Sequence, residues 1–481
     1  MENVNKYIVL GKAVLGVFAM AFLCYSCEEV EQVADPGLLS EQEDLRLDLK
    51  QYDNGSRVMM QAFYWDVEPI GEWYTVINSK LADWSSSGVD RIWLPPVSKG
   101  QSGMFSMGYD PSDYFDLGEF DQHGTVETRF GSRVELENLI NQAHDNDIEV
   151  IADVVLGHNS GGGKQDNPFR PGDTEVFSLF NEANGNASGK FNRTNEHFHP
   201  NDIHENDEQA LFFEKTDLCH DQVYVQDWLW KRDDSVAEYY KKIGFDGWRF
   251  DYVKSFSPNV VKQWNAKVGG FSVGENFDGN AEVLKKWVDE SGSPAFDFAC
   301  FYKLEEALDR FNDLTYLEGD MLRKIYPDKA VTFVANHDTE KDKNVNNKIS
   351  FSNKMLAYAY MLTHDGYPTI FYSDYENLTF QKTLKNLMEI HSTLATGPIE
   401  VLKLDQEEYI MQREGSANNP GLILYMNIGR RAKSVEVQSN WLNKNIIDYT
   451  GNMDKVLQTE AMGKVLLEVP AKSFAIWSIA K

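Results

Sequence analysis

The chain has 481 residues, of which 42% are hydrophobic, so it can bury a large α/β core and does not have a disordered composition. Its formal net charge of −29 argues against a nucleic-acid partner, because phosphate binding needs a basic surface. The aromatic content of 13% suits large cores, and it also suits a surface that stacks on flat ligands such as sugar rings.

The N-terminus predicts an export signal over residues 1–26. An apolar run at 13–23 follows two lysines; it is too short to cross a bilayer and has the length of a signal-peptide core. The Ser26-Cys27 pair resembles a bacterial lipoprotein cleavage site, which implies lipidation of Cys27 and anchoring to a bacterial outer membrane, on its periplasmic or its surface side. The alternative is a simple secretory peptide and a secreted protein.

Residues 27–52 are acidic and nearly free of aromatic side chains, so we expect a tether there. Beyond the tether the chain has two cysteines, Cys219 and Cys300. So few cysteines in a long exported chain argue against a disulfide framework.

From Val58 onward, short β-rich runs alternate with helical stretches such as 133–147 and 235–244, as in parallel βα units. Eight such runs predict a (β/α)8 TIM barrel formed by residues 53–158 and 223–392, with reactive groups at the C-terminal ends of the strands. The predicted strands are 58–63, 91–95, 149–155, 247–251, 271–275, 295–298, 330–335 and 368–372.

Two further regions complete the expected architecture. The stretch 159–222 after the third strand is too long for a plain loop, so we expect a small inserted domain there. After about residue 393 the helical pattern gives way to short strands separated by turns. This change predicts a C-terminal antiparallel β-sandwich domain over 393–481.

Acidic residues stand at the ends of three predicted strands: Asp251, Glu275 and Asp338. In a barrel these positions converge on one mouth, and His158 and His337 occupy equivalent places. A single acid at a strand end is often a helix N-cap, but three together favour chemistry. Paired carboxyl groups without a serine or cysteine nucleophile motif suit glycoside cleavage, which needs one carboxylate and one protonated carboxyl group.

Arg249 lies two positions before Asp251, so alternation along the strand places both side chains on the same side. We expect this fixed cation to keep Asp251 ionised. Glu275 would need the opposite setting, apolar or anionic, so that its carboxyl group stays protonated.

Four segments, in this order along the chain, resemble the four signature regions of the α-amylase family of glycoside hydrolases: ADVVLGH (152–158), GWRFDYVK (247–254), GEN (274–276) and FVANHD (333–338). The similarity spans 57–480 and is closest to the archaeal and plant type of α-amylase. It implies a nucleophilic Asp251, a general acid/base Glu275 and a transition-state stabiliser Asp338. It also implies a retaining double displacement at internal α-1,4 bonds of an α-glucan. The residues it assigns to substrate binding are Tyr109, His158, Arg249, Lys254 and His337.

The expected inserted domain carries a candidate zinc site. His199, His204 and Cys219 have ligand types and a spacing that could hold zinc, although buried cysteines and surface histidines are common without any metal. The archaeal α-amylases that the chain resembles hold a paired calcium–zinc site with this arrangement. The resemblance therefore implies zinc at these three residues.

For the neighbouring calcium, the resemblance implies side-chain oxygens of Asp207 and Asp217, the carbonyl oxygen of Ser255 and a carbonyl near Gln209. The chain departs from the family here, because Gly157 replaces an asparagine that is a calcium ligand. Calcium prefers six to eight oxygens, so this loss predicts a weaker, water-completed or absent site. The two aspartates could equally be ordinary solvated loop acids.

Other readings share parts of this pattern. A transglycosylase or an exo-acting, maltose-releasing hydrolase would use the same three carboxyl groups, so the sequence leaves these alternatives open. A non-catalytic glucan-binding lipoprotein would be expected to have lost at least one of them. His158 and His337 could be structural histidines, and Tyr109 could serve in packing alone. The sequence does not indicate an oligomeric state.

Overall fold

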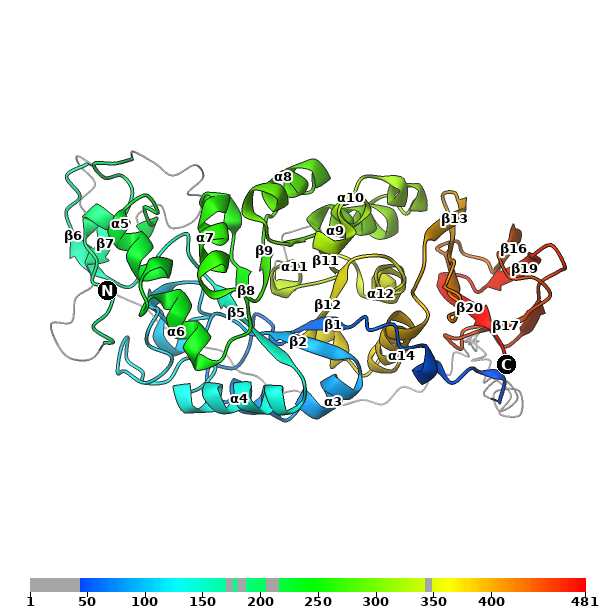
Figure 1. The fold of residues 1–481 in the computed structure, drawn as a ribbon, viewed down its shortest axis with the longest axis horizontal. Helices are drawn as coiled ribbons and strands as arrows, with labels where there is room; N and C mark the ends of the chain where they lie inside the picture. The colour runs from blue at the N-terminus through cyan, green and yellow to red at the C-terminus, as the bar shows by residue number, and fades with distance from the viewer. Residues whose placement is uncertain (1–43, 170–175, 180–186, 205–215, 342–347) are drawn as a thin grey trace, which may run out of the picture.

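In the computed structural model the described residues are 44–169, 176–179, 187–204, 216–341 and 348–481. Eight parallel strands close into a barrel, which confirms the predicted fold class (Figure 1). Around the barrel their order is β1, β12, β11, β10, β9, β8, β5 and β2. Their bounds are β1 (Val58–Gln61), β2 (Val89–Trp93), β5 (Glu149–Val154), β8 (Gly247–Phe250), β9 (Phe271–Gly274), β10 (Ala295–Phe296), β11 (Ala330–Phe333) and β12 (Tyr367–Phe371). Each of the eight predicted runs overlaps one of these strands; β2 begins two residues before its predicted run and β12 one residue before its own.

Helices follow the strands and cover the outside of the barrel (Figure 1). The helix α4 shows why they form. Ser132 and Glu135 make a reciprocal capping box at its start, and its buried residues recur at three- and four-residue spacing. The helices are α2 (Trp73–Asn78), α3 (Leu81–Ser86), α4 (Arg133–Asp145), α5 (Val223–Gln226), α6 (Val236–Ile243), α7 (Pro258–Val268), α8 (Ala281–Ser291), α9 (Phe298–Glu305), α10 (Leu322–Ile325), α11 (His337–Lys341), α12 (Lys354–Thr363), α13 (Tyr372–Tyr375) and α14 (Gln381–Thr393). None of the helices in the described ranges is long and apolar enough to span a bilayer.

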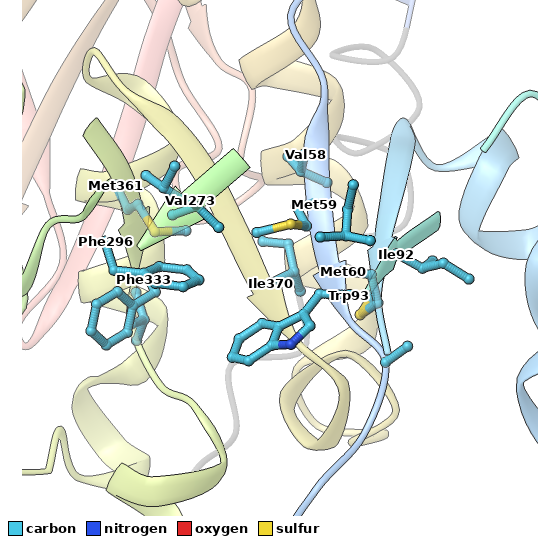
Figure 2. Close-up of a cluster of buried hydrophobic side chains, with 14 of the residues drawn as sticks. Val58, Met59, Met60, Ile92, Trp93, Val273, Phe296, Phe333, Met361 and Ile370 are labelled. Atoms are coloured by element: carbon cyan, nitrogen blue, oxygen red, sulfur yellow. The ribbon is translucent and has the colours of Figure 1, made fainter. Parts of the chain in front are cut away.

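Apolar side chains from the barrel strands and from α12 form one packed cluster (Figure 2). Strands β1, β8 and β11 are buried at every position, as expected for parallel strands covered on both faces. This packing fixes the strand ends that carry the candidate site. The labelled members of the cluster are Val58, Met59, Met60, Ile92, Trp93, Val273, Phe296, Phe333, Met361 and Ile370.

Two small hairpins lie between the barrel strands. The hairpin of β3 (Lys99–Gly100) and β4 (Pro111–Asp113) follows the second barrel strand. The hairpin of β6 (Gly163–Gln165) and β7 (Val176–Leu179) follows the third barrel strand, in the stretch expected to be an inserted domain.

The C-terminal part is an antiparallel β domain at the far end of the molecule from the β6–β7 hairpin (Figure 1). Its larger sheet has the order β13, β14, β15, β20, β17, β18, and a second sheet pairs β16 with β19. The bounds are β13 (Ile399–Leu404), β14 (Glu408–Arg413), β15 (Leu422–Asn427), β16 (Lys433–Gln438), β17 (Asn445–Asp448), β18 (Val456–Gln458), β19 (Lys464–Val469) and β20 (Ser473–Ile479).

Residues 44–52, which the sequence assigns to the tether, pack on the folded body. Leu49 is buried, and the short helix Leu49–Tyr52 contacts α14. The backbone N–H of Leu47 donates to the hydroxyl oxygen of Tyr449 over 3.1 Å, and Lys481 N–H donates to the Leu45 carbonyl oxygen over 2.9 Å. These contacts show that the segment belongs to the folded domain. The sequence did not indicate this, because an acidic composition does not reveal such docking.

Candidate active site

The centre of the candidate site is Arg249 on β8. Its side chain is fully buried, and the β5–β8 register pairs it with Asp153. Its Nη1 lies 2.8 Å from Asp153 Oδ1 and 2.8 Å from Asp251 Oδ1. Arg249 and Asp251 thus lie together as alternation along the strand predicts.

Glu275 follows β9 and joins the same cluster. Its Oε1 is 2.5 Å from Arg249 Nη2, and the backbone N–H of Tyr252 donates to its Oε2 over 3.1 Å. Tyr252 has a φ of 34°, a left-handed conformation that is unusual for a residue with a side chain. One guanidinium therefore bridges Asp251 and Glu275, which keeps the two carboxyl groups close together.

Burial and neighbouring charges hold a proton in this cluster. Loss of solvent raises the pKa of Glu275 to about 8; Arg249 opposes the shift, while the charges of Asp251 and Asp338 add to it. Burial likewise raises the pKa of Asp153 to about 7 against the effect of Arg249. A protonated Glu275 is what a general acid requires.

Asp338 lies in the short helix α11, and its side chain is 42% exposed. Its backbone N–H donates to Asn336 Oδ1 over 3.0 Å. The adjacent His337 is buried, and burial lowers its pKa to about 4, so the imidazole is neutral. Gln61 Nε2 donates to His337 Nδ1 over 2.8 Å, which places the imidazole proton on Nε2, 3.6 Å from Asp338 Oδ2.

Three flat rings stack beside the carboxyl cluster. Tyr109 lies 5.3 Å from His337 and 5.7 Å from Trp65 between ring centroids, with the planes within 8° of parallel. The Tyr109 hydroxyl donates to Asp153 Oδ2 over 2.8 Å. Such a stack offers an aromatic surface of the kind that sugar rings contact.

The two other residues expected to bind substrate have local partners. His158 Nε2 donates to the Tyr109 carbonyl oxygen over 2.7 Å, and burial lowers the pKa of this histidine. Lys254 pairs with Asp278 over 2.9 Å, close in sequence to Glu275. His158 therefore contacts the residue that carries the stacking ring.

Sequence reasoning missed Asp153 and Trp65 as site residues. Asp153 accepts hydrogen bonds from Tyr109 and from Trp93 Nε1, the latter over 3.0 Å, while it pairs with Arg249. An acid inside the otherwise apolar run 150–155 was the available signal. Trp65 comes shortly after β1, where a barrel strand delivers residues to the same mouth.

At the expected zinc site the structure brings His199 and Cys219 together. Burial opposes charge on His199, but hydrogen bonds to Asp217 and Cys219 raise the pKa of this histidine to about 10. Burial raises the pKa of the Cys219 thiol, but hydrogen bonds from His199 and Asn201 outweigh it and lower that pKa. His204 lies 6.3 Å from His199 between ring centroids.

This nitrogen and sulfur donor set is of the kind zinc takes. In the structure, however, His204 Nε2 pairs with Asp221 over 2.6 Å. No group of three or more His, Cys, Asp or Glu side chains within the described ranges is arranged to hold a metal. Two of the three expected ligands are therefore in contact, and the third would have to turn from Asp221.

The expected calcium site fits less well. Asp217 Oδ2 is 2.7 Å from His199 Nδ1, so its carboxylate already faces a cationic partner. A Cβ at Gly157 would lie 2.3 Å from Ser255 Oγ, so the serine hydroxyl occupies the space of the missing side chain. Asp207 and Gln209, like Cys27, lie outside the described residues.

Comparison with known proteins agrees with this geometry. A family model for the α-amylase catalytic domain matches residues 54–441, and one for an α-amylase C-terminal domain matches residues 422–478. The chain is 27% identical to the cytoplasmic α-amylase of Escherichia coli (strain K12), over 88% of this chain and 98% of that protein. It is 26% identical to the glucan 1,4-α-maltohexaosidase of Bacillus sp. (strain 707), over 90% and 94%.

Among solved structures, an α-amylase from Geobacillus thermoleovorans complexed with acarbose has a TM-score of 0.64 at 17% identity, covering 89% of this chain and 98% of that one. This likeness supports the fold. Both curated relatives named above are bacterial, so closeness to the archaeal and plant enzymes stays a prediction.

Proposed function

The chain belongs to the α-amylase family of glycoside hydrolases, and from this premise we propose that it hydrolyses internal α-1,4 bonds of starch-like glucans with retention at the anomeric carbon. The observation that carries the proposal is the single guanidinium that bridges a carboxyl group holding a proton, Glu275, and a partly exposed one, Asp251. Retaining glycosidases need such a close pair of unequal carboxyl groups.

In the proposed reaction, an Asp251 oxygen attacks the anomeric carbon while Glu275 transfers its proton to the glycosidic oxygen. The bond to that oxygen breaks, and a glycosyl ester with Asp251 forms. Glu275, now ionised, takes a proton from a water molecule, whose oxygen attacks the anomeric carbon and frees Asp251. Asp338 would stabilise the positive charge on the sugar in both steps, and the ring stack of Tyr109 and Trp65 would hold the sugar.

Soluble starch separates this proposal from its rivals. We would measure reducing-sugar release and iodine staining together, with Asp251→Asn as the matched inactive control. A fast loss of staining per sugar released supports internal attack, whereas a slow loss identifies an exo-acting enzyme. In a second assay with a maltooligosaccharide as the substrate, products longer than that substrate would identify a transglycosylase.

We also propose zinc at His199, His204 and Cys219, which would hold this part of the chain in shape rather than take part in the chemistry. Hydrogen bonds from His199 and Asn201 lower the pKa of the Cys219 thiol, toward the thiolate form that zinc binds. Elemental analysis of the purified protein, with Cys219→Ser as the matched variant, tests the proposal: a metal-free wild type contradicts it. For calcium, the departure at Gly157 supports only a weak, water-completed site.

We also propose that the chain is exported and anchored to a membrane by a lipid at Cys27, and the motif around Ser26-Cys27 supports this. Expression of the full chain in a bacterium, followed by membrane fractionation, tests this localisation. Wild type should fractionate with membranes, and Cys27→Ser should not. If wild type and Cys27→Ser were both found in the soluble fraction, the result would support simple secretion instead.

A further inference from the structure

Lys354, the first residue of α12, is a buried cation between two carboxylates. Its side chain is 6% exposed, and its Nζ lies 2.6 Å from Asp374 Oδ1 and 2.8 Å from Glu340 Oε1. The Tyr358 hydroxyl donates to the other oxygen of Asp374 over 2.8 Å. A lysine is seldom buried unless it is paired, so this arrangement is specific.

The two carboxylates belong to elements at the ends of neighbouring barrel strands. Asp374 lies on α13, which directly follows β12, and Glu340 lies on α11, which follows β11. Strands β11 and β12 are paired in the barrel. The ammonium therefore ties the ends of two adjacent strands together at the mouth that carries the candidate site.

Glu340 is also two residues from Asp338 in the single turn of α11. The start of that turn is fixed by Asn336, whose Oδ1 accepts from the backbone N–H groups of Asp338 and Thr339 over 3.0 and 2.9 Å. The later part of the turn is fixed by the ion pair of Glu340 with Lys354. Asp338 thus sits between two anchors.

We propose that Lys354 is a positioning residue for the reaction: it holds α11 through Glu340 and so keeps the Asp338 carboxylate in place beside the reacting sugar. The inference rests on the proposed role of Asp338. Without the ammonium, Glu340 and Asp374 would face each other as two unscreened negative charges, and α11 would move away from β12. A displacement of about 1 Å at a catalytic group can cost on the order of 100-fold in rate.

The test measures kcat and KM of Lys354→Met on a maltooligosaccharide. We expect kcat to fall about 10- to 100-fold while KM changes less than about threefold, because the lost interaction acts in the transition state. Lys403→Met is the matched control. Lys403 also bridges two carboxylates, Asp405 and Glu408, but it does so in the C-terminal domain. We expect this control to lower stability without lowering kcat.

A double-variant cycle separates positioning from a merely structural role. If Lys354 acts through Asp338, then Lys354→Met in an Asp338→Asn background should cost less than about threefold further in kcat, because the group it positions is gone. Glu340→Gln, at a partly exposed position, serves the same cycle if Lys354→Met does not fold.

The inference would be overturned if Lys354→Met lowered kcat by the same factor in wild type and in Asp338→Asn. It would also be overturned if Lys354→Met or Glu340→Gln had the kcat of wild type. Failure of the proposed function has a different signature. In that case Asp338→Asn and Asp251→Asn alone would retain near-normal activity, whatever the Lys354 variant does.

Discussion

Replacing Glu275 with glutamine should make the protein less active and should make its stability less dependent on pH. The folded chain holds a proton on Glu275 up to about pH 8, whereas the unfolded chain releases it near the ordinary value of 4.5. Between these two pH values the folded state binds one more proton than the unfolded state, so the stability contributed by this group falls as pH rises and levels off above about pH 8. Glutamine does not titrate.

The size of the effect follows from the two pKa values. Each pH unit between them changes the free energy of unfolding by about 1.4 kcal/mol, so wild type should lose about 4 kcal/mol more than Glu275→Gln between pH 5 and pH 8. This is an upper value, because at pH 5 the unfolded chain still holds part of a proton on this group, and at pH 8 the folded chain has released about half of it. The same proton sets the alkaline limb of kcat/KM, which in wild type should fall tenfold per pH unit above about pH 8.

Urea unfolding of both proteins at pH 5 and pH 8 measures the first effect, and a pH profile of kcat/KM on a maltooligosaccharide measures the second. The variant should lose several orders of magnitude in kcat/KM. Two results would refute the reasoning: the same pH dependence of stability in both proteins, or a wild-type alkaline limb that begins below pH 6.

Three further predictions concern other parts of the chain. Asp251→Asn should lose several orders of magnitude in kcat with an unchanged circular dichroism spectrum, and near-normal turnover would contradict a nucleophilic role. Gly157→Asn alone should not tighten calcium binding, because the new side chain clashes with the hydroxyl of Ser255. The double variant Gly157→Asn/Ser255→Gly should bind calcium more tightly. Calorimetric titration that gives the same calcium affinity for the single and the double variant would contradict this account. A chain that begins at residue 53 should be less stable than one that begins at residue 44 by about 2 to 4 kcal/mol, because it lacks the buried Leu49 and the hydrogen bonds with Tyr449 and Lys481. Equal melting temperatures would show that the docked segment contributes nothing.

The barrel was predictable because its signals are local. Each parallel strand is a short apolar run, and the acids at the strand ends converge through topology alone. Asp251, Glu275 and Asp338 could therefore be chosen as one set before any contact was known.

What the sequence did not reveal depends on contacts between distant segments. Asp153 belongs to the site because the register of β5 and β8 places it beside Arg249. The close contact between Gly157 and the hydroxyl of Ser255 is visible only in the fold, where the two residues meet. The docking of residues 44–52 relies on the burial of Leu49 and on hydrogen bonds to residues far along the chain, Tyr449 and Lys481, which an acidic composition does not indicate.

The division of roles among the acids follows from counting charges around Arg249. Asp153, Asp251 and Glu275 all contact one guanidinium, so three negative charges, two of them buried, would face a single positive one. Such an excess is costly where water is excluded, and it is relieved when one carboxyl group takes a proton. Asp153 accepts hydrogen bonds from Tyr109 and Trp93, which favour its ionised form, whereas burial and the charges of Asp251 and Asp338 favour the proton on Glu275. Asp251, at 15% side-chain exposure, keeps contact with solvent. An acid and a nucleophile thus arise from one cluster, and adding a second cation beside it should remove the distinction by releasing the proton from Glu275.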